Sequence, residues 1–120
     1  MAKTELETRT KHFALSLIDF VDRMPGHRSG DIVGKQLIPS GTSIGANYRE
    51  ANRAESRADF HHKLALAIKE SAETEFWLEL VHESKHLHTK GAEALLLESG
   101  ELIAILTTIM KNSKRSTTPK

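Results

Sequence analysis

The chain has no cysteine among its 120 residues. This absence excludes disulfide bonds, thiolate metal sites and cysteine nucleophiles. It also suits a reducing compartment, so we expect a cytoplasmic protein. The length fits a single domain, which can bury a hydrophobic core without a metal ion or a disulfide to stabilise it.

Long hydrophobic runs are also missing. No segment reaches the length of a transmembrane helix, and the stretch Met1–Lys11 is polar and charged. The sequence therefore predicts a soluble protein with no membrane partner and no signal peptide.

The net charge is close to zero, because 17 lysines and arginines are matched by 16 aspartates and glutamates. This balance excludes a protein that binds nucleic acid through its overall charge. Basic residues nevertheless concentrate locally. Arg49, Arg53 and Arg57 recur at four-residue spacing, which gives one helical face if the helix continues that far. The alternative is a solvated surface that binds no ligand.

The alternation of apolar and polar residues that marks strands is missing, whereas apolar residues recur at helical spacing. Turn and capping residues at Pro25, Ser56 and Gly91 separate four segments. We expect helices over about residues 4–24, 30–54, 57–87 and 92–112, which form one domain over 1–112, and a disordered basic tail over 113–120. Short connections make neighbours antiparallel, so the sequence predicts an all-α, up-and-down four-helix bundle.

Pro39 lies inside the second predicted helix. Proline lacks a backbone donor and clashes with the preceding turn, so we expect a kink or a local break there. Small residues follow it, and small side chains let a neighbouring helix approach closely. Ser43, Asn47 and Glu50 share one face of this helix, and polar groups on a packed face need partners.

The third predicted helix is apolar on more than one side. Phe76 and Leu80 point away from the stripe that one bundle core needs, and Trp77 lies on a flank. A helix that is apolar on two sides is usually buried on two sides, so these three residues are candidates for a subunit interface. The alternative is that loops cover them or that they stay half exposed.

One catalytic pattern occurs as a string, His82-Glu83-Ser84-Lys85-His86, which has the H-E-x-x-H form of zinc hydrolases. In those enzymes two histidines at i and i+4 on a helix bind zinc, and the glutamate activates water. Lys85 places a positive charge beside that site, and no third ligand is evident. We therefore expect no metal cofactor, with His82 and His86 as weak candidates for adventitious binding.

Two segments of the second predicted helix, Gly34–Leu37 and Ser40–Ala51, resemble the signature of the 23S rRNA-intervening-sequence protein family, the bacterial "four helix bundle protein" family. The similarity continues through Trp77–Leu80 and into the last helix. The resemblance implies a left-handed bundle that assembles as a homopentamer. It assigns a polar motif to the shared bundle architecture, and this motif comprises Ser43, Asn47, Glu50, Ser71 and Glu75. Pro39 departs from the family, in which a basic residue usually precedes Ser40.

These observations predict a non-catalytic, homo-oligomeric bundle, with a pentamer favoured, that needs no cofactor. The leading hypothesis is that it binds RNA or an RNA-associated protein through Lys35, Arg49, Arg53 and Arg57. The second hypothesis is a protein-binding scaffold with no affinity for nucleic acid. The third is a zinc hydrolase that uses His82, Glu83 and His86.

Overall fold

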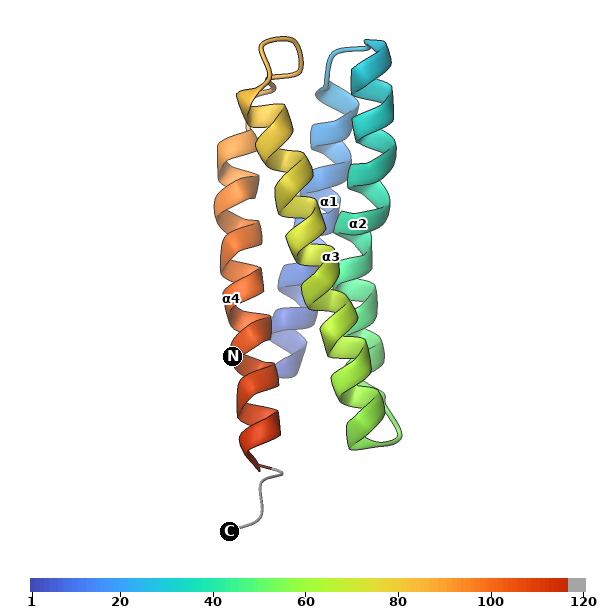
Figure 1. The fold of residues 1–120 in the computed structure, drawn as a ribbon, viewed down its shortest axis with the longest axis vertical. Helices are drawn as coiled ribbons and strands as arrows, with labels where there is room; N and C mark the ends of the chain where they lie inside the picture. Colours follow the sequence, from blue (N-terminus) through green and yellow to red (C-terminus); the bar gives the residue numbers. More distant parts are fainter. Residues whose placement is uncertain (117–120) are drawn as a thin grey trace.

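The computed structural model describes residues 1–116, and the chain forms four α-helices within this range. They are α1 (Lys3–Arg23), α2 (Arg28–Asn52), α3 (Arg57–Glu83) and α4 (Ala92–Ser116). The helices lie side by side and successive helices run in opposite directions, which gives an elongated molecule of 55 × 21 × 21 Å (Figure 1). The all-α four-helix bundle predicted from the sequence is confirmed, whereas its handedness stays a prediction.

Leucines and other aliphatic residues at helical spacing fill the centre of the bundle. Each helix contributes side chains that are fully buried, among them Leu17, Leu37, Ile44, Leu64, Leu78, Leu102 and Leu106. None of the helices within residues 1–116 offers the long apolar stretch that crossing a bilayer requires. The buried stripes are therefore used for packing between the four helices.

The small residues of α2 bring α1 unusually close. A methyl group added at Gly41 would lie 2.0 Å from Cδ2 of Leu17, and one added at Gly45 would lie 2.9 Å from Oγ1 of Thr10. No side chain fits at these two positions without movement of its neighbour. This contact confirms that the small residues serve close helix packing.

The third helix ends at Glu83, four residues earlier than expected. Ser84 takes an extended backbone conformation, and its hydroxyl accepts hydrogen bonds from the backbone N–H groups of His86 and Leu87, at 3.2 and 3.1 Å. Leu87 remains buried although it lies outside the helix. The helical spacing of apolar residues therefore continues past Glu83, which explains why the sequence predicts an end near residue 87.

The fourth helix extends to Ser116, so the expectation of a disordered tail is wrong for residues 113–116. Lys114 and Arg115 lie in its last turn, where positive charge is favoured by the helix dipole. The rest of the predicted tail, 117–120, lies outside the described residues.

Pro39 does not interrupt α2, which runs without a break from Arg28 to Asn52. The prediction of a local break is therefore wrong, and the predicted kink stays a prediction. Side-chain hydroxyls around the proline donate hydrogen bonds to carbonyls one turn earlier, from Thr42 to Ile38 at 2.7 Å and from Ser43 to Pro39. These bonds add donors to the carbonyls of Ile38 and Pro39, whereas the carbonyl that lacks its helical donor because of the proline is that of Lys35.

Candidate functional site

The three regularly spaced arginines do not lie on one helical face, because α2 ends before the second of them. Arg53 is the C-terminal capping residue of α2, and Arg57 is the first residue of α3. Ser56 starts the new helix by accepting a hydrogen bond from the backbone N–H of Asp59 at 3.0 Å, as the sequence predicts. The expectation that the three arginines share one helical face is therefore wrong, but the short loop keeps them at the same end of the bundle.

Each arginine makes a contact that fixes part of its side chain. Nε of Arg49 lies 3.8 Å from a carboxylate oxygen of Glu7, and 44 % of the Arg49 side chain is exposed. Arg53 donates to the carbonyl of Arg49 at 3.2 Å, and Arg57 donates to the carbonyl of Ser113 at 3.3 Å. The last of these bonds joins the start of α3 to the end of α4.

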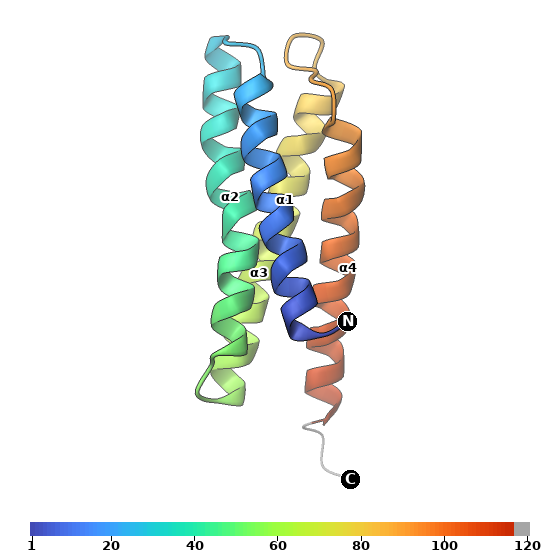
Figure 2. The same ribbon diagram turned by 180° about the vertical axis from the view of Figure 1, so that it is seen from behind.

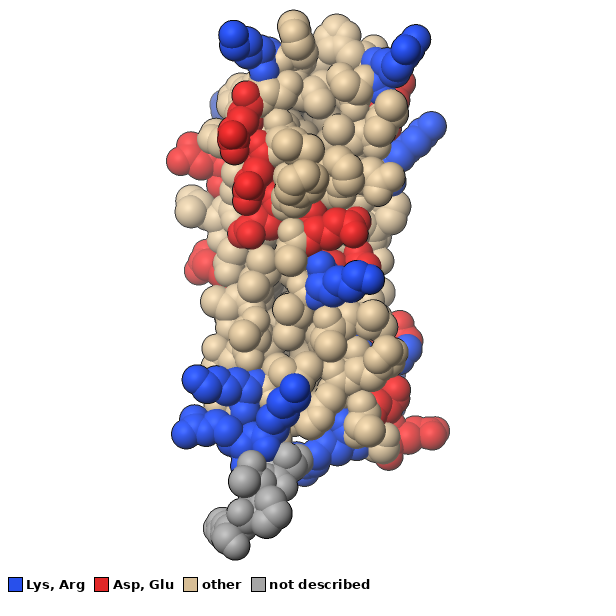
Figure 3. Space-filling model, in the orientation of Figure 1, with Lys and Arg blue, Asp and Glu red and all other residues tan. Residues whose placement is uncertain are grey.

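The end of α4 adds further positive charge to the same end of the molecule. Nε2 of His61 lies 2.8 Å from the Ser113 hydroxyl, so the last turns of α4 pack beside the first turn of α3. Figure 3 shows lysine and arginine side chains gathered at this end. We call it the basic end, and its residues are Arg49, Arg53, Arg57, Lys111, Lys114 and Arg115.

Lys35 does not belong to the basic end. It lies 14 residues before Arg49 on α2, which at 1.5 Å per residue is a distance of about 21 Å along the axis. The acidic residues near the basic end are partly neutralised, because Glu50 lies 3.2 Å from Nζ of Lys63 and Glu7 is paired with Arg49. Exposed Glu55 in the loop and Asp59 in the first turn of α3 are further opposing charges.

The predicted polar motif does not converge on a single site. On α2, Asn47 donates to the carbonyl of Ser43 at 2.9 Å, while Glu50 turns to Lys63. On α3, the buried hydroxyl of Ser71 donates to the carbonyl of Ala67 at 2.9 Å.

Glu75, the fifth member of the motif, is half-buried beside α4. One of its carboxylate oxygens lies 3.6 Å from the position that a methyl group on Gly100 would take. Most contacts of the polar motif thus stay within one helix, and they satisfy polar groups on packed faces rather than forming a binding site.

The H-E-x-x-H string is divided by the end of α3. His82 lies in the last turn of the helix, whereas His86 lies in the following turn and is exposed. The ring of His82 instead faces that of His88, at 5.6 Å between centroids, and Nδ1 of His88 lies 3.0 Å from the carbonyl of His82. Within residues 1–116 no group of three or more His, Asp or Glu residues is suited to hold a metal ion. The helical geometry that the zinc motif requires is not formed.

An apolar surface lies on the outer side of α3. Phe76 is 53 % exposed and Leu80 is 41 % exposed, while Trp77 is half-buried and meets Phe76 edge to face at 5.3 Å between ring centroids. The indole N–H of Trp77 is buried without a hydrogen-bond partner in the described part of the chain. We call these three residues the α3 apolar face.

A groove between α1 and α2 escaped the sequence analysis. It has a volume of about 620 Å³ and is open to solvent. We call it the α1–α2 groove, and its apolar lining comprises Val21, Met24, Pro25, Gly34, Ile38 and Pro39, with Asp22, Asp31 and Lys35 at its rim. Val21 and Met24 belong to the apolar stripe of α1, so their spacing predicts burial and gives no signal of a groove.

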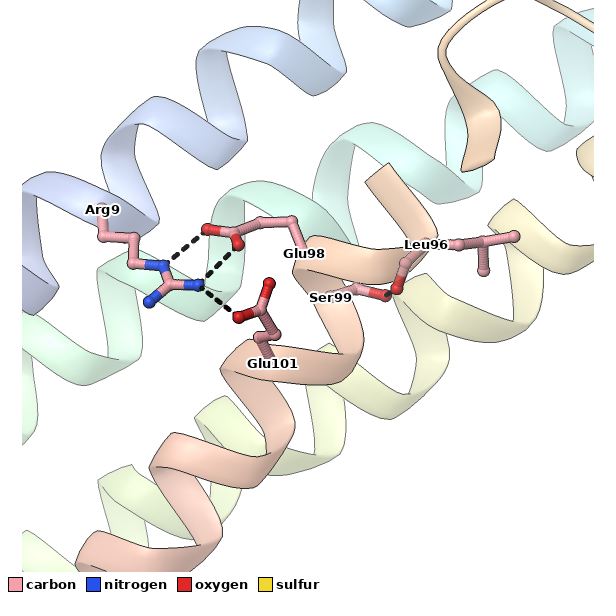
Figure 4. Close-up of polar contacts among 5 residues, drawn as sticks. All are labelled: Arg9, Leu96, Glu98, Ser99 and Glu101. Carbon is pink, nitrogen blue, oxygen red and sulfur yellow. Dashed lines mark hydrogen bonds and ion pairs between the residues drawn. The ribbon is translucent and has the colours of Figure 1, made fainter. Parts of the chain in front are cut away.

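A second groove lies between α1 and α4, lined by residues such as Arg9, Phe13, Leu95 and Glu98. These two helices, which lie side by side in Figure 2, are the least closely packed neighbours in the bundle. Arg9 and Glu98 cross this seam, and Glu101 lies 3.5 Å from Nη2 of Arg9 (Figure 4). The hydrogen bonds to Glu98 and the nearby negative charges raise the pKa of Arg9 above its ordinary value. This paired arginine stabilises the contact between the two helices and is not free to bind a ligand.

Comparison with known proteins matches most of the chain to one family. The family model described as "23S rRNA-intervening sequence protein" matches residues 3–108. A solved structure from Bacteroides thetaiotaomicron, described as a protein with unknown function from the S23 ribosomal protein family, is 36% identical. It superposes with a TM-score of 0.83, over 92% of this chain and 99% of the other. No curated protein matches the chain.

Proposed function

Because the chain belongs to the 23S rRNA-intervening sequence protein family, and because its positive charge is concentrated at one end, we propose that it is a non-catalytic, homo-oligomeric module that binds RNA or an RNA-associated protein in the cytoplasm. The observation that carries this proposal is the basic end. The α2–α3 connection and the last turns of α4, which lie far apart in the sequence, bring their lysines and arginines together there, although the net charge of the chain is only +1.

Phosphate groups are bound by clustered, accessible lysine and arginine side chains. Arg53 and Lys111 are both exposed at the basic end, and they come from the C-terminal cap of α2 and from α4. In an oligomer the same cluster would be repeated in every subunit, so weak contacts would add up. Tyr48 is buried, so stacking on bases is not part of the proposed recognition, and phosphate contacts dominate it.

A gel-shift titration with a structured RNA at several salt concentrations tests this proposal. We expect binding at low salt that weakens steeply as salt rises, because each phosphate contact releases counterions. The variant with Arg53→Glu and Lys111→Glu should lose most of this affinity. The variant with Lys85→Glu and Lys90→Glu is the matched control, because it makes the same charge change at two exposed lysines between α3 and α4, at the opposite end of the bundle, and it should bind like the parent. No binding at low salt, or equal loss in the control, would contradict RNA binding.

A second function, protein binding without nucleic acid, is favoured by the exposed α3 apolar face. It predicts no shift of any RNA and a stable complex through α3. Light scattering measures the assembly itself. A pentamer, which the family resemblance favours, would have five times the 13.4 kDa mass of the chain.

A further inference from the structure

We infer that the α3 apolar face of one copy inserts into the α1–α2 groove of the next copy. This inference rests on the proposed homo-oligomer and names the two surfaces that form it. Phe76 and Leu80 project from one side of the bundle, whereas the groove lies between helices on another side. The two surfaces are different, so the contact is heterologous and each copy can bind one neighbour on either side.

The two surfaces are complementary in shape and chemistry. The α3 apolar face presents an aromatic ring that is 53 % exposed beside a leucine that is 41 % exposed. The groove has an apolar lining and is open to solvent, and Gly34 in this lining packs closely against Val21, where a methyl group would lie 3.0 Å from Cγ1 of the valine. An aromatic side chain that enters such a groove removes apolar surface of both partners from water.

The two surfaces also lie at the same height along the bundle. Because α2 and α3 are antiparallel, moving along the bundle axis lowers the residue number in one helix as it raises that in the other. A residue of α2 and the residue of α3 at the same height therefore have numbers whose sum is nearly constant. Glu50 contacts Lys63 at 3.2 Å, and a methyl group at Gly30 would lie 3.4 Å from Leu87, which fixes the heights at both ends. Interpolation between them places Phe76 level with Ile38 to within about one helical turn of 5.4 Å.

Equal height decides what kind of assembly forms. A heterologous contact that shifts each copy along the axis builds an open filament, whereas one without a shift can close into a ring. By this interpolation the heights of the groove and the α3 apolar face agree to within about one helical turn. The contact therefore fits a closed ring of parallel bundles.

Charges around the two surfaces agree with this arrangement. Lys35 at the rim of the groove and Glu79 beside the α3 apolar face are both exposed. By the same interpolation, Lys35 lies level with residues 78–82 of α3, to within about one turn. When Phe76 enters the groove, Lys35 of one copy thus comes to the height of Glu79 of its neighbour.

The test uses two variants that each remove one surface, Phe76→Asp and Ile38→Asp. By light scattering, both should be monomers under conditions in which the parent chain is an oligomer. Mixed in equal amounts, they should form a heterodimer and nothing larger, because only one intact face and one intact groove remain. Leu97→Asp, which changes a 66 % exposed leucine of α4 outside both surfaces, is the control and should assemble like the parent.

Trp77 is the only tryptophan of the chain, so its fluorescence reports on the interface. Its emission should shift to longer wavelength in both monomeric variants and return in part on mixing, because only the Trp77 of Ile38→Asp is covered in the heterodimer. An oligomer that persists in Phe76→Asp, or two monomeric variants that do not combine, would overturn the inference. A parent chain that is itself monomeric would instead contradict the proposed oligomer.

Ile38 is half-buried, so Ile38→Asp is checked by circular dichroism before it is interpreted. If it does not fold, the charge pair provides the test. Lys35→Glu and Glu79→Lys should each raise the dissociation constant several-fold at low salt, and the double variant should restore it. If the double variant instead shows the combined loss of affinity of the two single variants, Lys35 and Glu79 do not pair.

Discussion

Arg9 and Glu98 lie 89 residues apart in the chain and face each other across the seam between α1 and α4. Nε and Nη2 of the arginine each donate to a different oxygen of the carboxylate, both at 2.7 Å. Two parallel charged hydrogen bonds are the strongest geometry that this pair of side chains can form. Because these helices are otherwise loosely packed, the pair is the main fixed point of the seam.

Arg9→Met should lower the free energy of unfolding by about 1–2 kcal/mol, the range of hydrogen bonds to charged groups that are not fully buried. For a domain of this size that corresponds to a fall of roughly 3–5 °C in Tm for each kcal/mol. Thermal unfolding of Arg9→Met, Glu98→Gln and the double variant measures the coupling between the two residues. Glu73→Gln, an exposed change in the middle of α3, should have little effect and serves as the control.

If the effects of Arg9→Met and Glu98→Gln simply add in the double variant, the two side chains do not interact in solution. That result would contradict the role given to the pair.

Tyr48 predicts a change of stability in alkaline solution. Burial raises the pKa of its phenol above the ordinary value, and the hydrogen bond with Asn52 offsets part of this effect. The unfolded chain therefore loses the phenolic proton at a lower pH than the folded chain, and stability decreases as pH rises above about 10. Below that pH the contribution of Tyr48 is fully present.

Lysines also titrate in this range, so the comparison is made with Tyr48→Phe. Chemical unfolding at pH values between about 8 and 11 should show a smaller loss of stability for the variant than for the parent. Equal slopes for the two proteins would show that the pKa of Tyr48 is the same in the folded and unfolded chains.

Gly41→Ala tests the close approach of α1 and α2. The added methyl group would lie 2.0 Å from Cδ2 of Leu17, which is fully buried, so the helices or the leucine must move. Overpacking of this kind costs about 1–3 kcal/mol, measured as a lower midpoint in urea. Gly26→Ala has open space around it and should be neutral within about 1 kcal/mol or slightly stabilising. A neutral Gly41→Ala would mean that the helices are farther apart in solution.

The fold could be predicted because apolar spacing and turn residues are local signals. Leu17, Leu37 and Leu78 lie on their stripes at helical intervals, and all three are fully buried. The same signal failed at the end of α3. Leu87 continues the helical spacing of apolar residues and is buried. Only the hydrogen bonds that the Ser84 hydroxyl accepts from the next backbone N–H groups mark where the helix ends.

The candidate site was harder to predict because it depends on which helices are neighbours. The spacing of Arg49, Arg53 and Arg57 indicates a cluster, but only the packing of α4 beside α3 adds Lys111 to it. The α1–α2 groove depends on the distance between two helices, and the Arg9–Glu98 pair joins opposite ends of the chain. No short-range pattern of residues encodes such distances.

The uneven packing of the four helices also sets the order in which parts of the molecule should open. The contact between α2 and α3 is extensive, whereas α1 meets α4 along a thin seam. At that seam, Arg9 pairs with Glu98, and Arg23 donates to the carbonyl of Lys90 at 2.8 Å. Because α1 has the least packing against its neighbours overall, it should unfold locally while the α2–α3 pair stays intact, and its amides should exchange with deuterium before global unfolding.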